Sequence, residues 1–181
     1  MRLGCGLGRG RQTDALVRRL MDLPQPLVLD ADGINALAGH MDEWERRRGR
    51  VTVLTPHEGE FLRVGGNLSQ GRTAAAEDFA RRSEAVVVLK GPGTVVAGPD
   101  GRCRVNTTGN CGMAKGGSGD VLSGVVLALL GLGMDAFDAC CCAVWLHGRA
   151  GDLAAQEKGQ WGMTPTDLLE RLPQALREVT E

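Results

Sequence analysis

Three short apolar runs constrain the fold of this chain more than any other feature. They lie within residues 27–30, 51–54 and 85–90, and turn-forming or polar residues follow each run directly. A strand that is apolar along its length is buried on both faces, as in a parallel sheet that helices cover on both sides. Helix-like segments at 33–39 and 69–83 separate the runs. This β-α-β-α-β order predicts a three-layer α/β fold with a mostly parallel central sheet.

After these runs the chain is predicted to form one hairpin and then mainly helices. Residues 95–97 and 103–105 flank a Gly-Pro-Asp-Gly turn, which predicts a pair of antiparallel strands. Helices are expected over 118–132 and 135–158. Because the 181 residues contain no evident linker or repeat, we expect a single domain spanning 1–181.

Two local segments receive structural interpretations. Residues 43–50 contain four arginines and are interpreted as a solvated helix end. Cys140, Cys141 and Cys142 lie on an expected helix, where neighbouring side chains point about 100° apart, so packing is favoured over metal binding. No metal-ligand spacing occurs among the six cysteines, which predicts no protein-held metal and a reducing compartment.

Composition argues against two classes of partner. The net charge is −1, with 21 basic and 22 acidic residues, and there are three Phe, three Trp and no Tyr. Such a chain has neither the basic face nor the stacking rings that nucleic acid requires. No apolar run is long enough to span a membrane, and the N-terminus lacks the apolar core of a signal peptide. We therefore expect a cytoplasmic protein without nucleic-acid or membrane partners.

The segment 106–122 runs a glycine-rich loop directly into an apolar helix. Gly116, Gly117 and Gly119 permit a tight turn with converging N–H groups, and a helix beginning near Ser118 adds its positive dipole. A carboxylate beside bound phosphate is useful if it takes a proton from an attacking hydroxyl, so Asp120 predicts phosphoryl transfer. The structural alternative makes Ser118 an N-cap and Asp120 a first-turn carboxylate. The spacing excludes a Walker loop and a Gly-x-Ser-x-Gly elbow.

Polar side chains gather where the apolar runs end, the edge at which open parallel sheets bind ligands. A capping box explains Thr55 and Glu58 but leaves His57 without a role, and Lys90 suits a phosphate partner. In contrast, His147 has an apolar helical context and is predicted to be a hydrogen-bonded packing residue. The edge comprises Asp30, Asp32, Asn35, Thr55, His57, Glu58, Glu60, Lys90, Gly91 and Thr94.

Five ordered motifs resemble those of the ADP/ATP-dependent NAD(P)H-hydrate dehydratases, members of the ribokinase-like superfamily. The resemblance runs from Gly4 to about Pro165 and implies a three-layer α/β/α ribokinase-like domain. It also implies a hydro-lyase that repairs hydrated NADH or NADPH: a nucleotide, ADP or ATP, phosphorylates the ring hydroxyl, and phosphate then leaves. Mg²⁺ is expected with the nucleotide, held largely by phosphate and water. The motifs occupy residues 4–8, 30–37, 55–60, 89–94 and 109–122.

The resemblance also implies roles for individual residues. Asp120 matches the base that acts on the substrate hydroxyl, and the amides of Gly117, Ser118 and Gly119 match the anion hole. Gly6 and His57 match positions that contact the hydrated dinucleotide, with Asn35, Asn110 and Asp120 as further substrate contacts. The nucleotide-binding positions are Lys90, Gly91, Pro92, Gly93, Thr94 and Gly119.

Two departures from the family pattern matter. Cys111 stands where the family usually has Pro, which places a thiol near a helix start. Family domains also carry a further portion before Gly4, so we expect an N-terminally truncated domain that lacks the strand leading into the glycines. An incomplete sheet exposes an apolar edge, which favours a homo-oligomer. A small-molecule kinase of the same superfamily and an inactive nucleotide-binding remnant stay open as alternatives.

Overall fold

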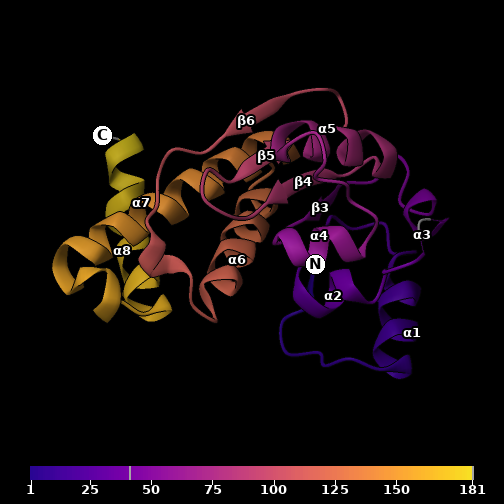
Figure 1. Ribbon diagram of the computed structural model, residues 1–181, viewed down its shortest axis with the longest axis horizontal. Coiled ribbons are helices and arrows are strands. Elements are labelled where there is room, and N and C mark those ends of the chain that lie inside the picture. Colours follow the sequence, from indigo (N-terminus) through magenta and orange to yellow (C-terminus); the bar gives the residue numbers. More distant parts are fainter. Residues whose placement is uncertain (41, 181) are drawn as a thin grey trace.

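The computed structural model describes residues 1–40 and 42–180, which form a six-stranded sheet with helices on both faces (Figure 1). The strand order is β1-β2-β3-β4-β5-β6, with parallel pairing from β1 to β4 and antiparallel pairing of β4, β5 and β6. This confirms the predicted mostly parallel sheet and the hairpin. The strands are β1 (Arg2–Leu3), β2 (Leu27–Leu29), β3 (Thr52–Leu54), β4 (Val86–Leu89), β5 (Val95–Ala97) and β6 (Cys103–Val105).

Helices separate the parallel strands and follow the last strand, and the longest ones come last. None of the described helices is long and apolar enough to cross a bilayer. A kink at Gly159 divides α7 near its end, where the backbone leaves helical geometry. The helical elements are α1 (Arg11–Leu20), α2 (Ala31–Asn35), α3 (Asp42–Glu45), α4 (Glu58–Arg63), α5 (Arg72–Ser83), η1 (Cys111–Met113), α6 (Ser118–Gly131), α7 (Ala136–Gly162) and α8 (Pro165–Thr180).

Alternate strand residues bury opposite faces of the sheet, as the pleat requires. Leu27 and Leu29 of β2 pack in the cluster that includes residues of α1, α4 and α5. Val28 points the other way, into a cluster with residues of α6 and α7. A third cluster joins α6, α7 and α8 beyond the sheet, at the left of Figure 1. Helix α7 thus packs on the sheet with one part and on α8 with another.

A short strand does lead into the first glycine motif, so the predicted absence of that strand is wrong. Arg2 and Leu3 pair in parallel with Val28 and Leu29. The chain then passes so close to β2 that a Cβ on Gly4, whose φ is +143°, would lie 1.6 Å from the Asp30 carbonyl oxygen. Only glycine permits that approach. Sequence inspection missed β1 because two residues are too short for a periodic signal.

The interpretation of residues 43–50 as a solvated helix end holds for Arg46 and Arg48, which are exposed just after α3, and is wrong for Arg47. Arg47 is only 1% exposed, and its guanidinium lies between the loop before β2 and the start of β3. It donates to the carbonyl oxygens of Gln25 and Val51, both at 2.9 Å, and to Thr52 Oγ1 at 3.0 Å. Burying a charge is costly without partners, and five N–H donors suit a pocket of carbonyl groups. Burial lowers the pKa of Arg47 from its usual value.

The cysteine run packs as predicted. Cys140 is fully buried against the sheet, whereas Cys141 and Cys142 are partly buried on the same helix. Desolvation raises the pKa of the Cys141 thiol to about 11. These side chains are free thiols that fill space.

Candidate active site

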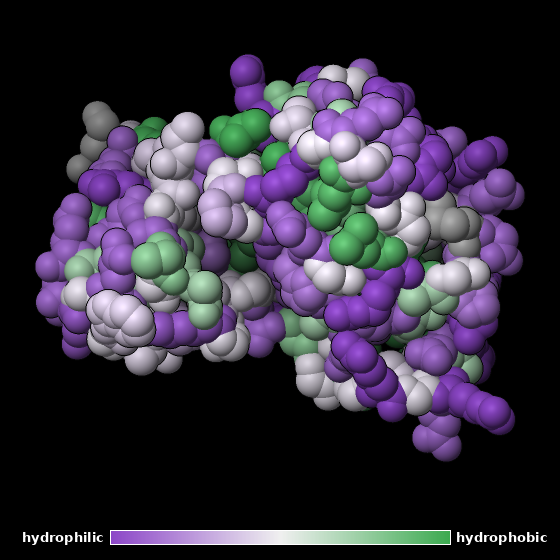
Figure 2. All heavy atoms as spheres, in the orientation of Figure 1, coloured by the Kyte–Doolittle hydropathy of each residue, from purple (hydrophilic) through white to green (hydrophobic). Residues whose placement is uncertain are grey.

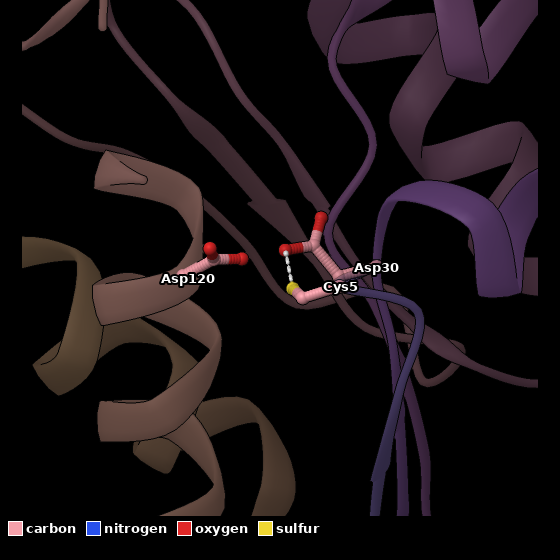
Figure 3. Close-up of side chains that lie close together, drawn as sticks. All are labelled: Cys5, Asp30 and Asp120. Atoms are coloured by element: carbon pink, nitrogen blue, oxygen red, sulfur yellow. Dashed lines mark hydrogen bonds between the residues drawn. The ribbon is translucent and has the colours of Figure 1, made fainter. Parts of the chain in front are cut away.

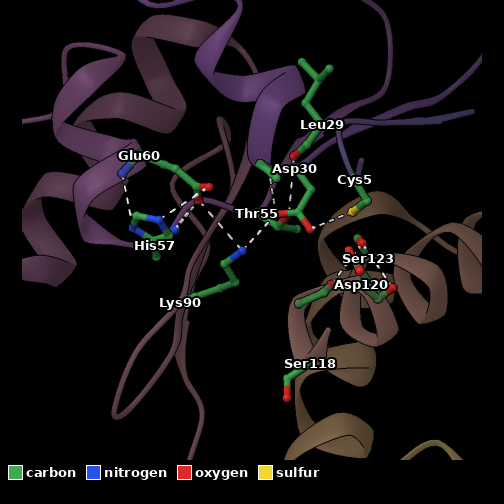
Figure 4. Close-up of polar contacts among 12 residues, drawn as sticks. Cys5, Leu29, Asp30, Thr55, His57, Glu60, Lys90, Ser118, Asp120 and Ser123 are labelled. Carbon is green, nitrogen blue, oxygen red and sulfur yellow. Dashed lines mark hydrogen bonds and ion pairs between the residues drawn. The ribbon is translucent and has the colours of Figure 1, made fainter. Parts of the chain in front are cut away.

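The carboxyl ends of β2, β3 and β4 meet the first turn of α6 at one edge of the sheet. Asp30 follows β2, and Lys90 follows β4, where a parallel bridge to His57 continues the β3–β4 pairing. The Lys90 Nζ lies 2.8 Å from Asp30 Oδ1 (Figure 4). A Cβ added to Gly119 would lie 3.3 Å from that Nζ and 3.6 Å from Asp30 Oδ2. The edge therefore brings together the cation, the carboxylate and the glycine loop that the sequence predicts.

The glycine loop presents backbone N–H groups at the start of α6. Gly117, with φ +98°, is the N-cap and supplies no side-chain cap, so the interpretation of Ser118 as N-cap is wrong. The Ser118 amide donates to the Lys115 carbonyl at 3.2 Å. Within the described residues, no hydrogen bond engages the amides of Gly117, Gly119 or Asp120. Free amides at a helix N-terminus form an anion site.

Lys90 lies between two buried carboxylates. The side chain of Asp30 is 3% exposed and also accepts from the Ala31 amide at 3.0 Å. Glu60 Oε2 lies 3.9 Å from the Lys90 Nζ, and its side chain is 7% exposed. Two carboxylates around one ammonium hold it in place and leave an excess negative charge. This arrangement accommodates a further cation or donor more easily than a bare anion.

His57 has a structural role that the sequence did not reveal, because it is itself the N-cap of α4. Its Nδ1 accepts from the amides of Gly59 at 3.0 Å and Glu60 at 3.3 Å, and Glu60 Oε2 accepts from the His57 amide at 2.8 Å. The capping box therefore begins at His57 and not at Thr55. Thr55 is buried and donates to the Leu29 carbonyl. The His57 Nε2 lies 3.5 Å from Glu60 Oε1, and about half of the His57 side chain is exposed.

Asp120 projects from the first turn of α6 toward the end of β1 and the start of α2 (Figure 3). Its Oδ1 accepts from Arg2 Nη2 at 2.9 Å, and about half of the side chain is exposed. Cys5, Asp30 and Asp120 each place one ligand atom within 4.8 Å of the others. Desolvation, with the Asp120 hydrogen bond next, raises the pKa of the Cys5 thiol to about 11. Cys5 is therefore a neutral thiol at physiological pH, with little nucleophilic character.

Arg2 and Cys5 were missed in the sequence. Both lie at the N-terminus, and Cys5 falls within the glycine motif without a ligand spacing of its own. Assigning residues 2–3 as a strand would have placed Cys5 at the carboxyl edge of the sheet, beside Asp30. Strand β1 contains only one apolar residue, Leu3, so its sequence shows no pattern from which a strand could be predicted.

Two predicted asparagines are already occupied by protein partners. Asn110 donates from Nδ2 to Asp152 Oδ1 at 2.9 Å, and its Oδ1 accepts from the Gly112 amide at 3.0 Å. Asn35 accepts from Arg63 and borders a shallow hollow of about 200 Å³. Gly6, by contrast, has φ +71° with open space around its α-carbon. Of these three positions, Gly6 is the most accessible to a ligand.

The predicted nucleotide segment forms the turn between β4 and β5. Gly91 and Gly93 have φ values of +150° and +61°, and Thr94 Oγ1 donates to the Gly91 carbonyl at 3.0 Å. Arg72 braces this turn by donating to the Leu89 carbonyl at 3.0 Å and to the Pro92 carbonyl. Residues 91–93 are exposed, so the turn stands open to solvent beside Lys90.

The predicted packing role of His147 is confirmed. The imidazole lies on α7 and its Nε2 is 2.9 Å from the Ser118 carbonyl oxygen. Burial is the main cause that lowers its pKa to about 4, with Lys90 contributing in the same direction. The ring is therefore neutral at physiological pH.

Comparisons with known proteins agree on one family. A family model described as NAD(P)H-hydrate dehydratase matches residues 1–174. The bifunctional NAD(P)H-hydrate repair enzyme Nnr of Thermofilum pendens is 45% identical over 184 residues, covering 99% of this chain and 35% of that protein. The ADP-dependent (S)-NAD(P)H-hydrate dehydratase of Neisseria meningitidis is 40% identical over 164 residues, covering 87% of this chain and 55% of that protein.

A solved structure of a protein from the same family has a similar fold. The ADP/ATP-dependent NAD(P)H-hydrate dehydratase from Bacillus subtilis, co-crystallized with ATP/Mg²⁺, has a TM-score of 0.84 at 35% sequence identity. The match covers 98% of this chain and 63% of that one. The chain therefore spans between 35% and 63% of the length of these three relatives.

Proposed function

Because this chain belongs to the NAD(P)H-hydrate dehydratase family, we propose that it acts in the nucleotide-dependent dehydration of hydrated NADH or NADPH. ADP or ATP is the phosphoryl donor. The observation that carries the proposal is the placement of Asp120 beside free amides of the glycine loop, across from Lys90. A base, an anion hole and a phosphate counter-charge are what phosphoryl transfer to a hydroxyl requires.

In the proposed reaction Asp120 takes the proton from the hydroxyl of the hydrated nicotinamide ring. The hydroxyl oxygen then bonds to the terminal phosphorus of the nucleotide, and the bond from that phosphorus to the bridging oxygen breaks. Arg2 holds the Asp120 carboxylate in place from 2.9 Å. The amides of Gly117 and Gly119 stabilise the charge on the transferred group. Departure of phosphate from the ring carbon, with loss of the neighbouring ring proton, restores the reduced dinucleotide.

The anion hole in this proposal differs slightly from the one that the family resemblance implies. Gly117 and Gly119 have free amides, whereas the Ser118 amide donates to the Lys115 carbonyl. Ser118 therefore contributes only if that bond opens when phosphate binds. The Asp120 amide is free as well and extends the row of donors along the first helical turn.

Lys90 and the turn that follows it, through Gly91, Pro92, Gly93 and Thr94, are proposed to hold the nucleotide phosphates together with Mg²⁺. The cation is needed because Asp30 and Glu60 already offset the charge of the Lys90 ammonium. The oxygen donors of Asp30 and Asp120 lie close enough to fit Mg²⁺, which prefers carboxylate, phosphate and water oxygens. Bound there, Mg²⁺ neutralises charge on the phosphates. Asp30 already serves Lys90, so phosphate and water would supply most of the coordination.

The substrate contacts are proposed at Gly6 and His57, with Asn35 and Asn110 as weaker candidates. Gly6 lies in an open loop beside Cys5, and about half of the His57 side chain is exposed although both ring nitrogens lie near residues of α4. Asn110 already uses both polar ends of its side chain within the protein, which leaves it little capacity for a substrate. We therefore propose that the nicotinamide ring binds between Gly6 and Asp120.

We further infer that the chain is one domain, is cytoplasmic and self-associates. Leu169, Leu176 and Val179 are about half exposed and fall on one face of α8, and Leu132 and Trp161 are far more exposed. Figure 2 shows apolar groups scattered over a mainly polar face, so the face in view offers no broad apolar patch. Light scattering measures the oligomeric state directly. A monomer at micromolar concentration would contradict the inference.

The test is to incubate the protein with hydrated NADH, Mg²⁺ and ADP or ATP and to follow absorbance of the reduced nicotinamide. We expect recovery, and we expect Asp120→Asn to lower turnover by about 10² or more while nucleotide binding persists. Asp78→Asn, at an exposed ion pair on α5, is the matched control. Accumulation of a phosphorylated alcohol without repair would favour the small-molecule kinase. Nucleotide binding without turnover of either substrate would favour the inactive remnant.

A further inference from the structure

Helix α7 lies along the glycine loop and fastens both of its ends. At the beginning, Asp152 accepts from the Gly109 amide and from Asn110 Nδ2, each at 2.9 Å. At the far end, His147 Nε2 bonds to the Ser118 carbonyl at 2.9 Å. Both ends of the loop lie 29 or more residues from their partners on α7 in the sequence, so only the tertiary fold brings them together. The loop is therefore shaped by this helix before any ligand binds.

The approach of the loop to α7 depends on small residues. A Cβ added to Gly148 would lie 2.2 Å from Thr108 Oγ1 and 2.7 Å from the Thr108 carbonyl carbon. Thr108 Oγ1 also donates to the Trp145 carbonyl at 3.0 Å. The loop and the helix thus touch backbone to backbone, and the position of the loop is fixed to within small displacements.

The His147 bond acts on one particular peptide unit. The Ser118 carbonyl and the Gly119 amide belong to the same peptide, which is planar and trans, so the C=O and N–H groups point in opposite directions. Fixing the oxygen toward α7 fixes the Gly119 N–H away from α7. Gly119 is the residue whose α-carbon faces Lys90 and Asp30. A hydrogen bond to a carbonyl also polarises the attached N–H and strengthens it as a donor.

His147 suits this task chemically. A carbonyl oxygen only accepts, so Nε2 must carry the proton and donate. Burial keeps the ring neutral, and a neutral donor fixes the peptide without adding a second positive charge beside Lys90. A lysine or arginine at this position would compete for the phosphate that Lys90 is proposed to hold.

Resting on the proposed function, we propose that His147 is a positioning residue for phosphoryl transfer. It orients and polarises the Ser118–Gly119 peptide so that the Gly119 N–H points at the transferred group, and it touches neither substrate nor nucleotide. Asp152 performs the corresponding task at the start of the loop, by holding Gly109 and Asn110.

The test compares two replacements of His147. His147→Leu removes the donor, and His147→Gln retains an N–H that reaches the same carbonyl. We expect His147→Leu to lower kcat on the order of tenfold with KM for hydrated NADH nearly unchanged, since anion-hole donors act mainly in the transition state. His147→Gln should recover most of that loss. Val144→Ala, buried on α7 away from the loop, controls for lost stability.

A second measurement separates this inference from the proposed reaction. In ¹⁵N-labelled protein, the Gly119 amide resonance should move downfield on titration with MgADP in wild type and in His147→Gln, and much less in His147→Leu. If wild type fails to repair hydrated NADH, the proposed function fails, and the Gly119 response still decides the role of His147. An unchanged kcat and Gly119 response in His147→Leu would overturn the inference. So would a wild-type Gly119 amide that ignores MgADP, or a glutamine variant as impaired as the leucine variant.

Discussion

The glycine-rich segments 4–10 and 109–119 border the same site and differ in what surrounds their glycines. In the first segment, a Cβ added to Gly6, Gly8 or Gly10 would meet nothing within 4 Å. In the second, a Cβ on Gly112 would lie 2.5 Å from the Gln160 carbonyl oxygen. Apart from Gly4, which packs against the Asp30 carbonyl at the end of β1, the glycines of the first segment leave open space. In the second segment Gly109 and Gly112 permit close packing, whereas a Cβ on Gly116 would also meet nothing within 4 Å. The first loop therefore has room for a ligand, whereas the second loop is held in shape by contacts with other parts of the chain.

The supporting contacts follow the same division. Segment 4–10 is tied to the rest of the chain by the Gly8 amide, which donates to Asp32 Oδ2 at 3.0 Å, and by Thr13, which donates to the Leu7 carbonyl. The later loop is held by Asp152 and His147 on a long helix. Preformation of the proposed anion hole would lower the cost of reorganisation during reaction, whereas the proposed substrate loop would benefit from adjustment.

The largest expected effect tests the packing of the second loop. Gly148→Ala should lower the free energy of unfolding by about 3 kcal/mol, because the new methyl group overlaps Thr108 backbone atoms that have no room to move. Gly124→Ala is the matched control, since it is also helical and its Cβ meets nothing within 4 Å. The control should be neutral or slightly stabilising. Urea unfolding measures both, and equal stabilities would show that the loop is not packed against α7.

A pH titration tests the buried imidazole that anchors the second loop. The folded pKa of His147, about 4, lies below its unfolded value near 6.5, so the unfolded chain binds the proton first. The free energy of unfolding should fall as the pH drops from about 6.5 to 4. Below pH 4, protonation of His147 should change it no further. The full difference is about 3 kcal/mol. His147→Gln should remove this part of the pH dependence. Parallel stability curves for the two proteins over that range would refute it.

Much of the second loop could be predicted from the sequence, but the contacts that His147 and Asp152 make with it could be predicted only in part. The glycines and Asp120 predict an anion site because the loop and the helix are contiguous in the chain, so the whole motif is visible in the sequence. The partner of His147 lies 29 residues away and that of Asp152 lies 42 to 43 residues away, so no local pattern joins them. Tertiary contacts likewise explain why Arg47 was misassigned, since three of its carbonyl partners, Met21, Leu23 and Gln25, lie 22 to 26 residues earlier in the chain.

The sheet was predictable for the opposite reason. Strands β2, β3 and β4 are apolar along their length, and burial on both faces is a property of each strand by itself. His57 shows the limit of such local reasoning. A Thr-Pro-His-Glu sequence allows two registers of the capping box, and burial of Thr55 against Leu29 selects the later one. The proposed substrate contact and the helix cap are then the same side chain, that of His57.

An intermediate effect is expected at the first anchor of the second loop. Asp152→Ala leaves the Gly109 amide and Asn110 Nδ2 without their acceptor and should cost about 2 kcal/mol of stability. Asp32→Ala removes the acceptor of the Gly8 amide in the first loop, where solvent replaces it, and should cost less than about 1 kcal/mol. Thermal unfolding of the two variants gives the comparison. A larger loss for Asp32→Ala would reverse the assignment of preformed and adjustable loops.

The smallest effect on stability, with a distinct effect on function, is expected at Gly6. Gly6→Ala places a methyl group in open space and costs about 1 kcal/mol through the left-handed backbone alone, since φ is +71°. The same methyl group occupies room that we assign to the hydrated ring, so KM for hydrated NADH should rise while affinity for MgADP stays unchanged. Steady-state kinetics and calorimetric titration measure the two quantities on one preparation. Weakened MgADP binding in Gly6→Ala would mean that the first loop also shapes the nucleotide site, and an unchanged KM would mean that the open space beside Gly6 receives no substrate.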